Sequence, residues 1–205
     1  MSEEAGRRTQ QERRATTERR VLDAATELIA QRGSRAVTLA DVGRAAGYSR
    51  GIVHAHFGSR EQLLEAVVRD AQRFAVPPAE GDGLDQLTAL VTAYLANVRT
   101  RTPSTGAFLL LWAESVADDP VLGPLFAERD TAFRAALAEQ VRQGTADGSV
   151  RADADPDAVA VVLVGLLRGI GMQLASTSGR ALEAAGDGVV DAAAALVRQG
   201  LGPRG

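Results

Sequence analysis

Apolar side chains recur at three- and four-residue steps along most of this chain, which is the spacing that gathers them on one face of an α-helix. The first run spans Val21 to Ile29 and ends before Gly33. Short runs separated by glycines follow up to residue 57, and longer runs fill the rest of the chain. No segment alternates apolar and polar positions for long, so the pattern predicts an all-α fold without a β-sheet.

Three segments of the chain differ in this spacing. Residues 1–14 are polar and charged without periodicity, and we interpret them as a flexible arm. Residues 15–62 hold a helix from about Ala15 and then short elements, which we interpret as one small domain. Residues 63–205 form a second, larger domain whose helices resume after a PPAEGDG linker and a Pro77-Pro78 break. The longer helices are expected at residues 60–75, 84–99, 103–117, 126–143, 156–176 and 187–201.

Capping residues mark several of the predicted helix starts. Thr38 stands just before LADVGRAA, and Asp41 is the third residue after it, which predicts a capping box in its Asp form. Asp155 is placed to cap the apolar helix that follows, and Pro156 suits the first helical position.

The composition narrows the classes of protein to which this chain could belong. Hydrophobic residues make up 45% of it, so it can bury a core. It has no cysteine, which excludes disulfides, thiolate metal ligands and a cysteine nucleophile. The apolar run at residues 158–167 is shorter than the roughly 20 residues of a membrane span, and the charged N-terminus lacks the apolar stretch of a signal peptide. We therefore expect a cytoplasmic protein with no membrane partner.

Charge is distributed unevenly along the chain. All 23 basic residues are arginine. Residues 1–76 hold thirteen of them against ten acidic residues, whereas residues 77–205 hold ten against sixteen. A basic first third is consistent with an anionic partner at one end, and equally with a chance imbalance of surface charge.

The short helices before residue 57 need a structural reason, because isolated two-turn helices are marginal in water. Gly47 lies between two of them, and a helix, a tight glycine turn and a second helix form the helix-turn-helix motif. Gly43 and Ala46 are small enough to let the two helices approach closely. The residues expected to point inward and form a small core against the first helix are Val42, Ile52, Val53 and Phe57.

The second helix of this motif, about Ser49 to His56, is the candidate recognition helix, whose first residues meet base edges in the major groove. Arg50 can read guanine, and Gly51 lets the backbone come near the DNA. Thr38 and Ser59 start helices whose free N–H groups favour anions. The other candidates for contact with phosphate are Tyr48, His54, His56 and Arg60.

From residue 18 to residue 68 the chain resembles the DNA-binding domain of the TetR family of transcriptional regulators. The matching features are an apolar first helix ended by a Gly, a Thr before the second helix, an Ala-Gly turn, Ser-Arg-Gly opening the third helix, and His-Phe followed by Ser-Arg-Glu. The resemblance implies a homodimer in which three N-terminal helices bind operator DNA and a divergent C-terminal domain binds a small ligand and dimerises. By position, it implies DNA contacts for Thr38, Arg50, Gly51, His54, His56 and Arg60.

Two positions depart from the family pattern. His54 stands where the family often has Tyr, and Ala55 stands where a second polar or aromatic residue is common, which implies a lost phosphate contact. The C-terminal part, with GAFLLLWAESVADDPVLGPLF and DGSVRADADPDAVA before an apolar helix, resembles the BetI-like subgroup. That resemblance does not transfer a choline response, because the ligand pocket varies among members.

Some of these residues also invite other interpretations. His54 and His56 are two residues apart, about 200° around a helix, so they point to opposite faces and are poorly placed to share a metal ion. Neither histidine has an obvious Ser or Cys nucleophile beside it, and we expect no metal, no cofactor and no enzymatic activity. The glycines of GLLRGIG follow an apolar helix rather than a strand, which favours close helix contact at a dimer interface over a nucleotide-binding loop.

Candidate ligand-binding residues lie in the C-terminal helices. Arg168 interrupts an apolar helix, and burying an arginine is costly unless it is paired. It therefore either lies at the helix surface or faces a pocket for an acidic ligand. The last two helices of each chain would form a four-helix dimer interface. The other pocket candidates, which could equally be core residues, are Phe108, Trp112, Phe133, Met172 and Gln173.

These features favour a homodimeric DNA-binding transcriptional regulator, most simply a repressor that a small molecule releases from a palindromic operator. The alternative is a helical small-molecule sensor whose DNA binding is lost or weak. The basic N-terminal third argues against that alternative.

Overall fold

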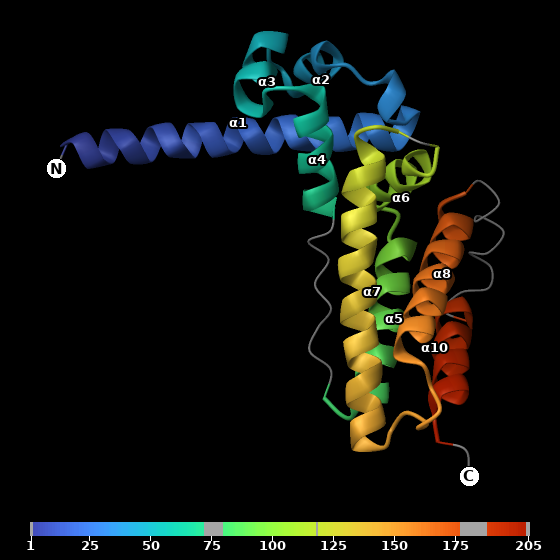
Figure 1. The fold of residues 1–205 in the computed structure, drawn as a ribbon. Helices are drawn as coiled ribbons and strands as arrows, with labels where there is room; N and C mark the ends of the chain where they lie inside the picture. Colours follow the sequence, from blue (N-terminus) through green and yellow to red (C-terminus); the bar gives the residue numbers. More distant parts are fainter. Residues whose placement is uncertain (1, 72–79, 118, 177–187, 204–205) are drawn as a thin grey trace. The chain divides into compact units, whose positions relative to one another are not determined.

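A computed structural model describes residues 2–71, 80–117, 119–176 and 188–203 of the 205-residue chain, and over these residues it is all-helical (Figure 1). This confirms the all-α prediction. The expected Pro77-Pro78 break lies outside the described residues. The elements are α1 (Ser2–Arg32), a 3-10 turn η1 (Ser34–Ala36), α2 (Leu39–Ala46), α3 (Arg50–Phe57), α4 (Arg60–Ala71), α5 (Gly83–Arg99), α6 (Pro103–Ser115), α7 (Leu122–Asp147), α8 (Pro156–Ala175) and α10 (Gly188–Leu201).

The chain folds into two compact units. The first unit comprises Met1–Arg73 and Pro103–Leu122, and the second comprises Phe74–Thr102 and Gly123–Gly205. The segment Pro103–Leu122, which contains α6, therefore packs in the first unit, although the chain before and after this segment belongs to the second. Packing places both α4 and α6 in the first unit. The domain boundary expected after residue 62 remains a prediction.

Capping interactions set the ends of the short helices in the first unit. The Thr38 side chain accepts a hydrogen bond from the Asp41 backbone N–H, and the Asp41 carboxylate accepts one from the Thr38 N–H, which confirms the capping box. Gly47 ends α2 with a left-handed φ of 78°, which glycine adopts without steric cost. A Cβ atom at Gly43 would lie 2.9 Å from the Tyr48 carbonyl oxygen, so α2 approaches the turn as closely as a glycine permits.

The core of the first unit draws on α1, α2, α3, α4 and α6, with both α1 and α4 packed on α6. Val42 and Val53 are fully buried as expected, and Phe57 is half-buried. The inward position predicted for Ile52 is wrong, because 40% of this residue is exposed. Each residue of an α-helix is turned by about 100° from the one before it, and Val53 already takes the inward direction.

Helix α1 begins at Ser2, so residues 2–14 are helical. The sequence had suggested a flexible arm over residues 1–14. Residues 10–16 are exposed, which explains why they show no apolar periodicity. Most of them are Gln, Glu, Arg and Ala, which are good helix formers. Once the packed part of α1 is nucleated, each further residue adds a hydrogen bond at little cost.

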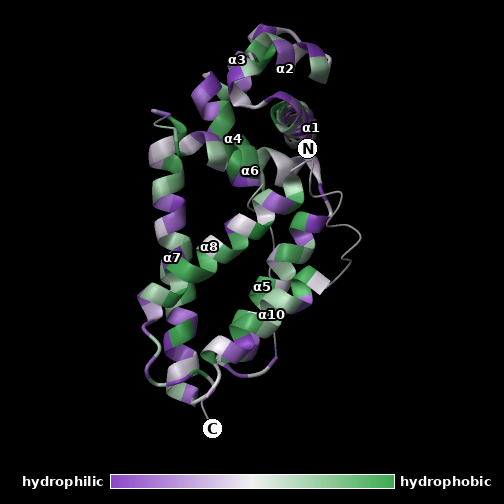
Figure 2. Cartoon of the chain, turned by 90° about the vertical axis from the view of Figure 1, so that its right-hand side faces the viewer, coloured by the Kyte–Doolittle hydropathy of each residue, from purple (hydrophilic) through white to green (hydrophobic). Residues whose placement is uncertain are grey.

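Helices α5, α7, α8 and α10 form the core of the second unit, and α5 packs against both α8 and α10. Figure 2 shows apolar residues gathered along α5, α8 and α10. Asp155 caps α8 and Pro156 is at its start, which confirms both predictions. The fully buried core residues are Leu87, Val91, Leu95, Leu137, Val141, Ala160 and Leu167.

By length and composition, α8 is the one helix in the described part of the chain that could cross a membrane. Core helices pass the same test, and α8 contributes Leu163, Leu167 and Leu174 to the buried interior. Its apolar character is therefore weak evidence for a membrane span.

Candidate functional site

Helix α3 carries most of the predicted DNA contacts. The hydroxyl of Ser49 accepts a hydrogen bond from the Ile52 backbone N–H at 3.3 Å and so caps the helix. Arg50 and His54 are both exposed, and their four-residue spacing places them on the same side of the helix. Gly51 is exposed next to Arg50. The first turns of α3 thus bring a guanidinium and an imidazole together on an accessible surface.

Thr38 is exposed at the start of α2, but its hydroxyl donates to the Asp41 carboxylate at 2.6 Å. This hydrogen bond, followed by the one from the Thr38 backbone, lowers the pKa of Asp41. Arg44 pairs with the same carboxylate at 3.1 Å, and 78% of its side chain is exposed. A phosphate would have to compete with Asp41 for the Thr38 hydroxyl proton.

Tyr48 lies in the turn between α2 and α3 and is half-buried. A hydrogen bond with the Thr17 side chain, and then the hydrogen bond and positive charge of Arg20, lower the pKa of Tyr48. Both partners belong to α1, so the Tyr48 side chain lies close to that helix. Arg20 is exposed and adds a cation beside the turn. No local signal in the sequence predicted this neighbour.

Arg60, the first residue of α4, turns its guanidinium toward the connection between α1 and α2. Its Nη2 donates to the Ser34 carbonyl oxygen at 2.7 Å, and its Nε donates to the Val37 carbonyl oxygen at 3.2 Å. Glu114 of α6 accepts a hydrogen bond from the Ser34 backbone N–H at 2.9 Å and another from its hydroxyl. Arg60 thus has a structural role that the sequence did not predict, and its DNA contact remains a prediction.

The two histidines of α3 differ in their surroundings. His54 is exposed, whereas His56 is half-buried and its Nδ1 is enclosed without a hydrogen-bond partner in the described structure. No group of three or more His, Cys, Asp or Glu side chains within the described ranges could hold a metal ion. His54 is thus the histidine that is free to meet a partner at the surface.

The six ligand-binding candidates fall in both units. In the first unit, Phe108 is buried on α6 and Trp112 is half-buried on the same helix. In the second unit, Phe133 is partly buried against the core, Met172 is half-buried and Gln173 is exposed. Exposure of Gln173 places it away from the interior that a buried ligand would occupy.

Arg168, the sixth candidate, lies at the centre of a polar network inside the second unit. Only 5% of it is exposed. Its Nη1 donates to the Tyr94 hydroxyl oxygen at 3.1 Å, and its Nη2 pairs with the Asp130 carboxylate at 3.1 Å. Burial raises the pKa of Tyr94. Arg168 is therefore buried and paired, with partners from α5 and α7 that the sequence did not identify.

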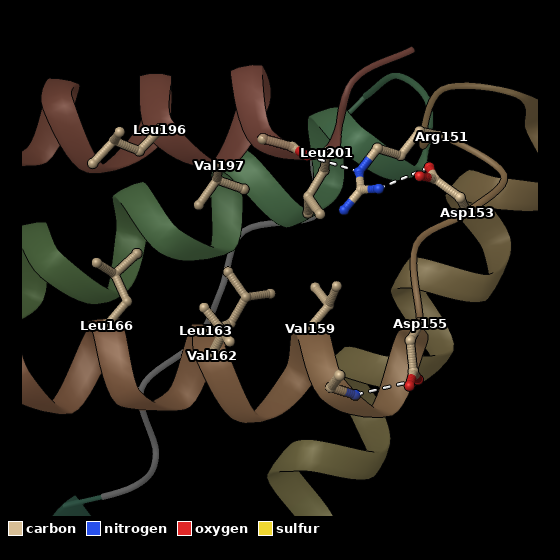
Figure 3. Close-up of a pocket in the computed structure, with 12 residues that line it drawn as sticks. Arg151, Asp153, Asp155, Val159, Val162, Leu163, Leu166, Leu196, Val197 and Leu201 are labelled. Atoms are coloured by element: carbon tan, nitrogen blue, oxygen red, sulfur yellow. Dashed lines mark hydrogen bonds and ion pairs between the residues drawn. The ribbon is translucent and has the colours of Figure 1, made fainter. Parts of the chain in front are cut away.

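A hollow of about 570 Å³ lies between α8 and α10 (Figure 3). At one end, Arg151 pairs with Asp153 at 2.7 Å. Val162 is 68% exposed and Leu196 is 64% exposed, so this side of the second unit is unusually apolar. The apolar walls are formed by Val159, Val162, Leu163, Leu166, Leu196, Val197 and Leu201.

Both parts of the chain match described families. Residues 21–67 match the bacterial regulatory proteins of the tetR family, and residues 83–199, more than half of the chain, match the C-terminal domain of BetI-type transcriptional repressors. The chain belongs to the TetR family. This confirms both resemblances drawn from the sequence.

Relatives of this TetR-family chain include named regulators. The HTH-type transcriptional regulator BetI of Rhizobium meliloti is 28% identical over 107 residues, which are 49% of this chain and 53% of BetI, so the match spans about half of that relative. The HTH-type transcriptional repressor KstR2 of Mycolicibacterium smegmatis is 30% identical over 149 residues, 68% of this chain and 70% of KstR2. A transcriptional regulator from Saccharomonospora viridis, solved in complex with choline, shares the fold with a TM-score of 0.73 and 24% identity, over 93% of this chain and all of that one (100%).

Proposed function

We propose that this TetR-family protein is a cytoplasmic transcriptional repressor that binds operator DNA as a homodimer and is released by a small molecule. The observation that carries the proposal is the exposed face of α3, which presents Arg50 and His54 directly after the Gly47 turn. Arginine is the side chain that most often reads guanine in the major groove. No enzymatic activity is proposed, since its named relatives are regulators.

Each predicted DNA contact has a proposed task. Arg50 reads a base edge, and Gly51 allows the α3 backbone to come close. Thr38 and Ser49 lie at helix starts, where an anion is favoured. The proposed phosphate contacts are Tyr48, His54, His56 and Arg60.

The proposed dimer interface is the apolar side of α8 and α10. Val162 and Leu196 are exposed there, and so is Val161, at 59%. Two helices from each chain would bury these side chains in a four-helix arrangement with closed two-fold symmetry. Two copies of α3 could then meet successive major grooves about 34–36 Å apart.

The proposed effector site is in the interior of the C-terminal part of the chain. Arg168 is the group there that would hold an acidic effector, by exchanging its pair with Asp130 for a ligand carboxylate. Phe133 and Met172 are partly buried and could contact the apolar part of such a ligand. Gln173 is exposed, and Phe108 and Trp112 belong to the first unit, so these three stay predictions from the sequence and are not part of this proposed site.

A second candidate function is a small-molecule sensor with weak or lost DNA binding. It is favoured by Arg60, whose donors bind carbonyl oxygens inside the first unit, and by Ala55, which offers no polar group on α3. The basic first third of the chain opposes it.

The test is selection of duplex DNA from a random library by the full-length protein, followed by fluorescence anisotropy at two salt concentrations. The proposal expects a palindromic duplex bound at least about 10³-fold more tightly than a scrambled one, with affinity falling as salt rises. Equal, weak binding to both duplexes would favour the sensor. An Arg50→Ala variant with unchanged sequence preference would remove Arg50 from the proposal.

A further inference from the structure

Ile52 is an exposed branched apolar residue on the surface proposed to meet DNA. It is 40% exposed, and the other exposed large apolar residue in the described part of the first unit is Val116, which follows α6. Val116 lies outside the helix-turn-helix, whereas Ile52 is in the first turn of α3. Its side chain is therefore available to a partner on the DNA side.

The geometry of α3 shows where Ile52 points. At about 100° per residue, Gly51 and Ala55 lie at the centre of the exposed face, opposite the buried Val53. Arg50 and His54 fall on one side of that centre, and Ile52 falls on the other. The middle of the face carries no long side chain, so a groove can come close to the backbone while the flanking side chains reach its two sides.

The orientation of Ile52 is fixed before any DNA binds. Its backbone N–H donates to the Ser49 hydroxyl at 3.3 Å and to the Ser49 carbonyl oxygen at 3.1 Å. Inside a helix, the branched isoleucine side chain strongly prefers one rotamer. Little conformational freedom is therefore lost when this side chain meets a partner.

The major groove offers one apolar group that distinguishes a base, the C5-methyl of thymine. We propose that Ile52 reads a thymine methyl in each half-site, within about two base pairs of the base that Arg50 reads. Two residues of α-helix rise about 3 Å, close to the roughly 3.4 Å between successive nucleotides of one strand. The inference rests on the proposed function, and it adds thymine beside the Arg50 position as a feature of the operator.

The test uses deoxyuridine, which pairs like thymine but lacks the methyl group. Each thymine of the selected duplex is replaced singly, and the Kd is measured for the full-length protein and for its Ile52→Ala and Ile52→Val variants. For the wild type, one of these replacements in each half-site should raise the Kd about fourfold. This factor corresponds to the free energy gained by burying one methyl-sized group. Ile52→Ala should bind the thymine and deoxyuridine duplexes alike, whereas Ile52→Val should keep most of the difference.

A Val116→Ala variant is the matched control, because it truncates another exposed apolar side chain of the same unit, outside α3 and 73% exposed. It should discriminate thymine from deoxyuridine as the wild type does. If a specific duplex is selected but no thymine couples to residue 52, the assignment of Ile52 is overturned while the proposed function stands. If no specific duplex can be selected, both are overturned.

Discussion

The carboxylate of Glu114 in α6 accepts hydrogen bonds from Ser34, 80 positions earlier in the chain. Ser34 is fully buried at the start of the turn between α1 and α2, and Arg60 donates to its carbonyl oxygen. The segment Pro103–Leu122, which contains α6, is joined at both ends to chain of the second unit. A rearrangement that moved α6 would therefore have to move Ser34 with it or break this contact. Glu114 thus links α6 to the connection that leads into the helix-turn-helix.

Replacing Glu114 with Gln should lower the free energy of unfolding by about 1–3 kcal/mol, because two hydrogen bonds to a charged acceptor are replaced by weaker, partly mismatched ones. Urea unfolding followed by circular dichroism measures the change. Glu27→Gln, at an exposed position of α1, is the matched control and should change stability little. Equal unfolding midpoints for all three proteins would show that Glu114 does not hold the connection.

Breaking the Arg168–Asp130 pair should be far more costly than breaking a surface pair. Asp130→Asn leaves the buried guanidinium without its carboxylate and should destabilise the protein by about 3–5 kcal/mol. In Glu139→Gln, the lost pair with Arg142 is exposed, and the cost should stay below about 1 kcal/mol. Chemical denaturation measures the free energy of unfolding of both variants. Similar small decreases in the two would mean that the buried pair contributes little to stability.

The capping box predicts an unusual titration of Asp41. Its folded-state pKa is lowered from the ordinary 3.8, so the stabilisation is present above that value and is lost as the pH falls through the folded pKa. Thr38→Val removes the hydroxyl that contributes most, and the pKa of Asp41 should rise toward 3.8. Carboxyl chemical shifts recorded against pH measure this. Ser49→Ala, which removes the cap of α3, should leave the Asp41 titration unchanged.

The apolar side of α8 and α10 should control assembly. Leu196→Glu places a charge in the proposed dimer interface and should raise the dimer dissociation constant by at least about tenfold, which corresponds to 1.4 kcal/mol. Sedimentation velocity across a concentration series measures it. Val116→Glu adds the same charge at an exposed position of the first unit and should not change association. A dimer unaffected by Leu196→Glu would move the interface elsewhere.

Arg50 and Arg20 should affect DNA binding in different ways. Arg50→Ala should cost about 1–3 kcal/mol of discrimination at one base position and relax the preference there. Arg20→Ala should weaken binding to all duplexes alike and lower the salt dependence by about one phosphate contact per chain. Affinities for single-base operator variants at several salt concentrations separate the two effects. If both variants lose affinity uniformly, Arg50 contacts phosphate and does not read a base.

Local features of the fold followed from the sequence with little ambiguity. The Thr38–Asp41 capping box, the left-handed Gly47 and the Asp155-Pro156 start of α8 all appear as predicted. Each depends on residues within a few positions of one another, so its geometry is determined by the backbone of one turn. The family resemblance of the N-terminal part rests on the same short-range signals.

The direction of individual side chains was harder to predict. Periodicity predicted a buried face for α3 and wrongly placed Ile52 on it. A helix of eight residues has too few apolar positions to define the centre of its buried face. For residues 2–14, the absence of an apolar stripe suggested no helix. Residues 10–14 are exposed, and an exposed helix needs no such stripe.

By itself, the sequence determined the helical class, the helix-turn-helix and the order of the elements, because hydrogen bonds within a turn and the helical period depend on neighbouring residues. Only the tertiary structure decided the partners of Arg60 and Arg168. Asp130 lies 38 positions from Arg168 and Tyr94 lies 74, so no periodic or local signal connects them. A buried charge requires a partner, and the sequence alone does not show which helix supplies it. The packing of the helices decides this, because it brings residues that are distant in the chain together.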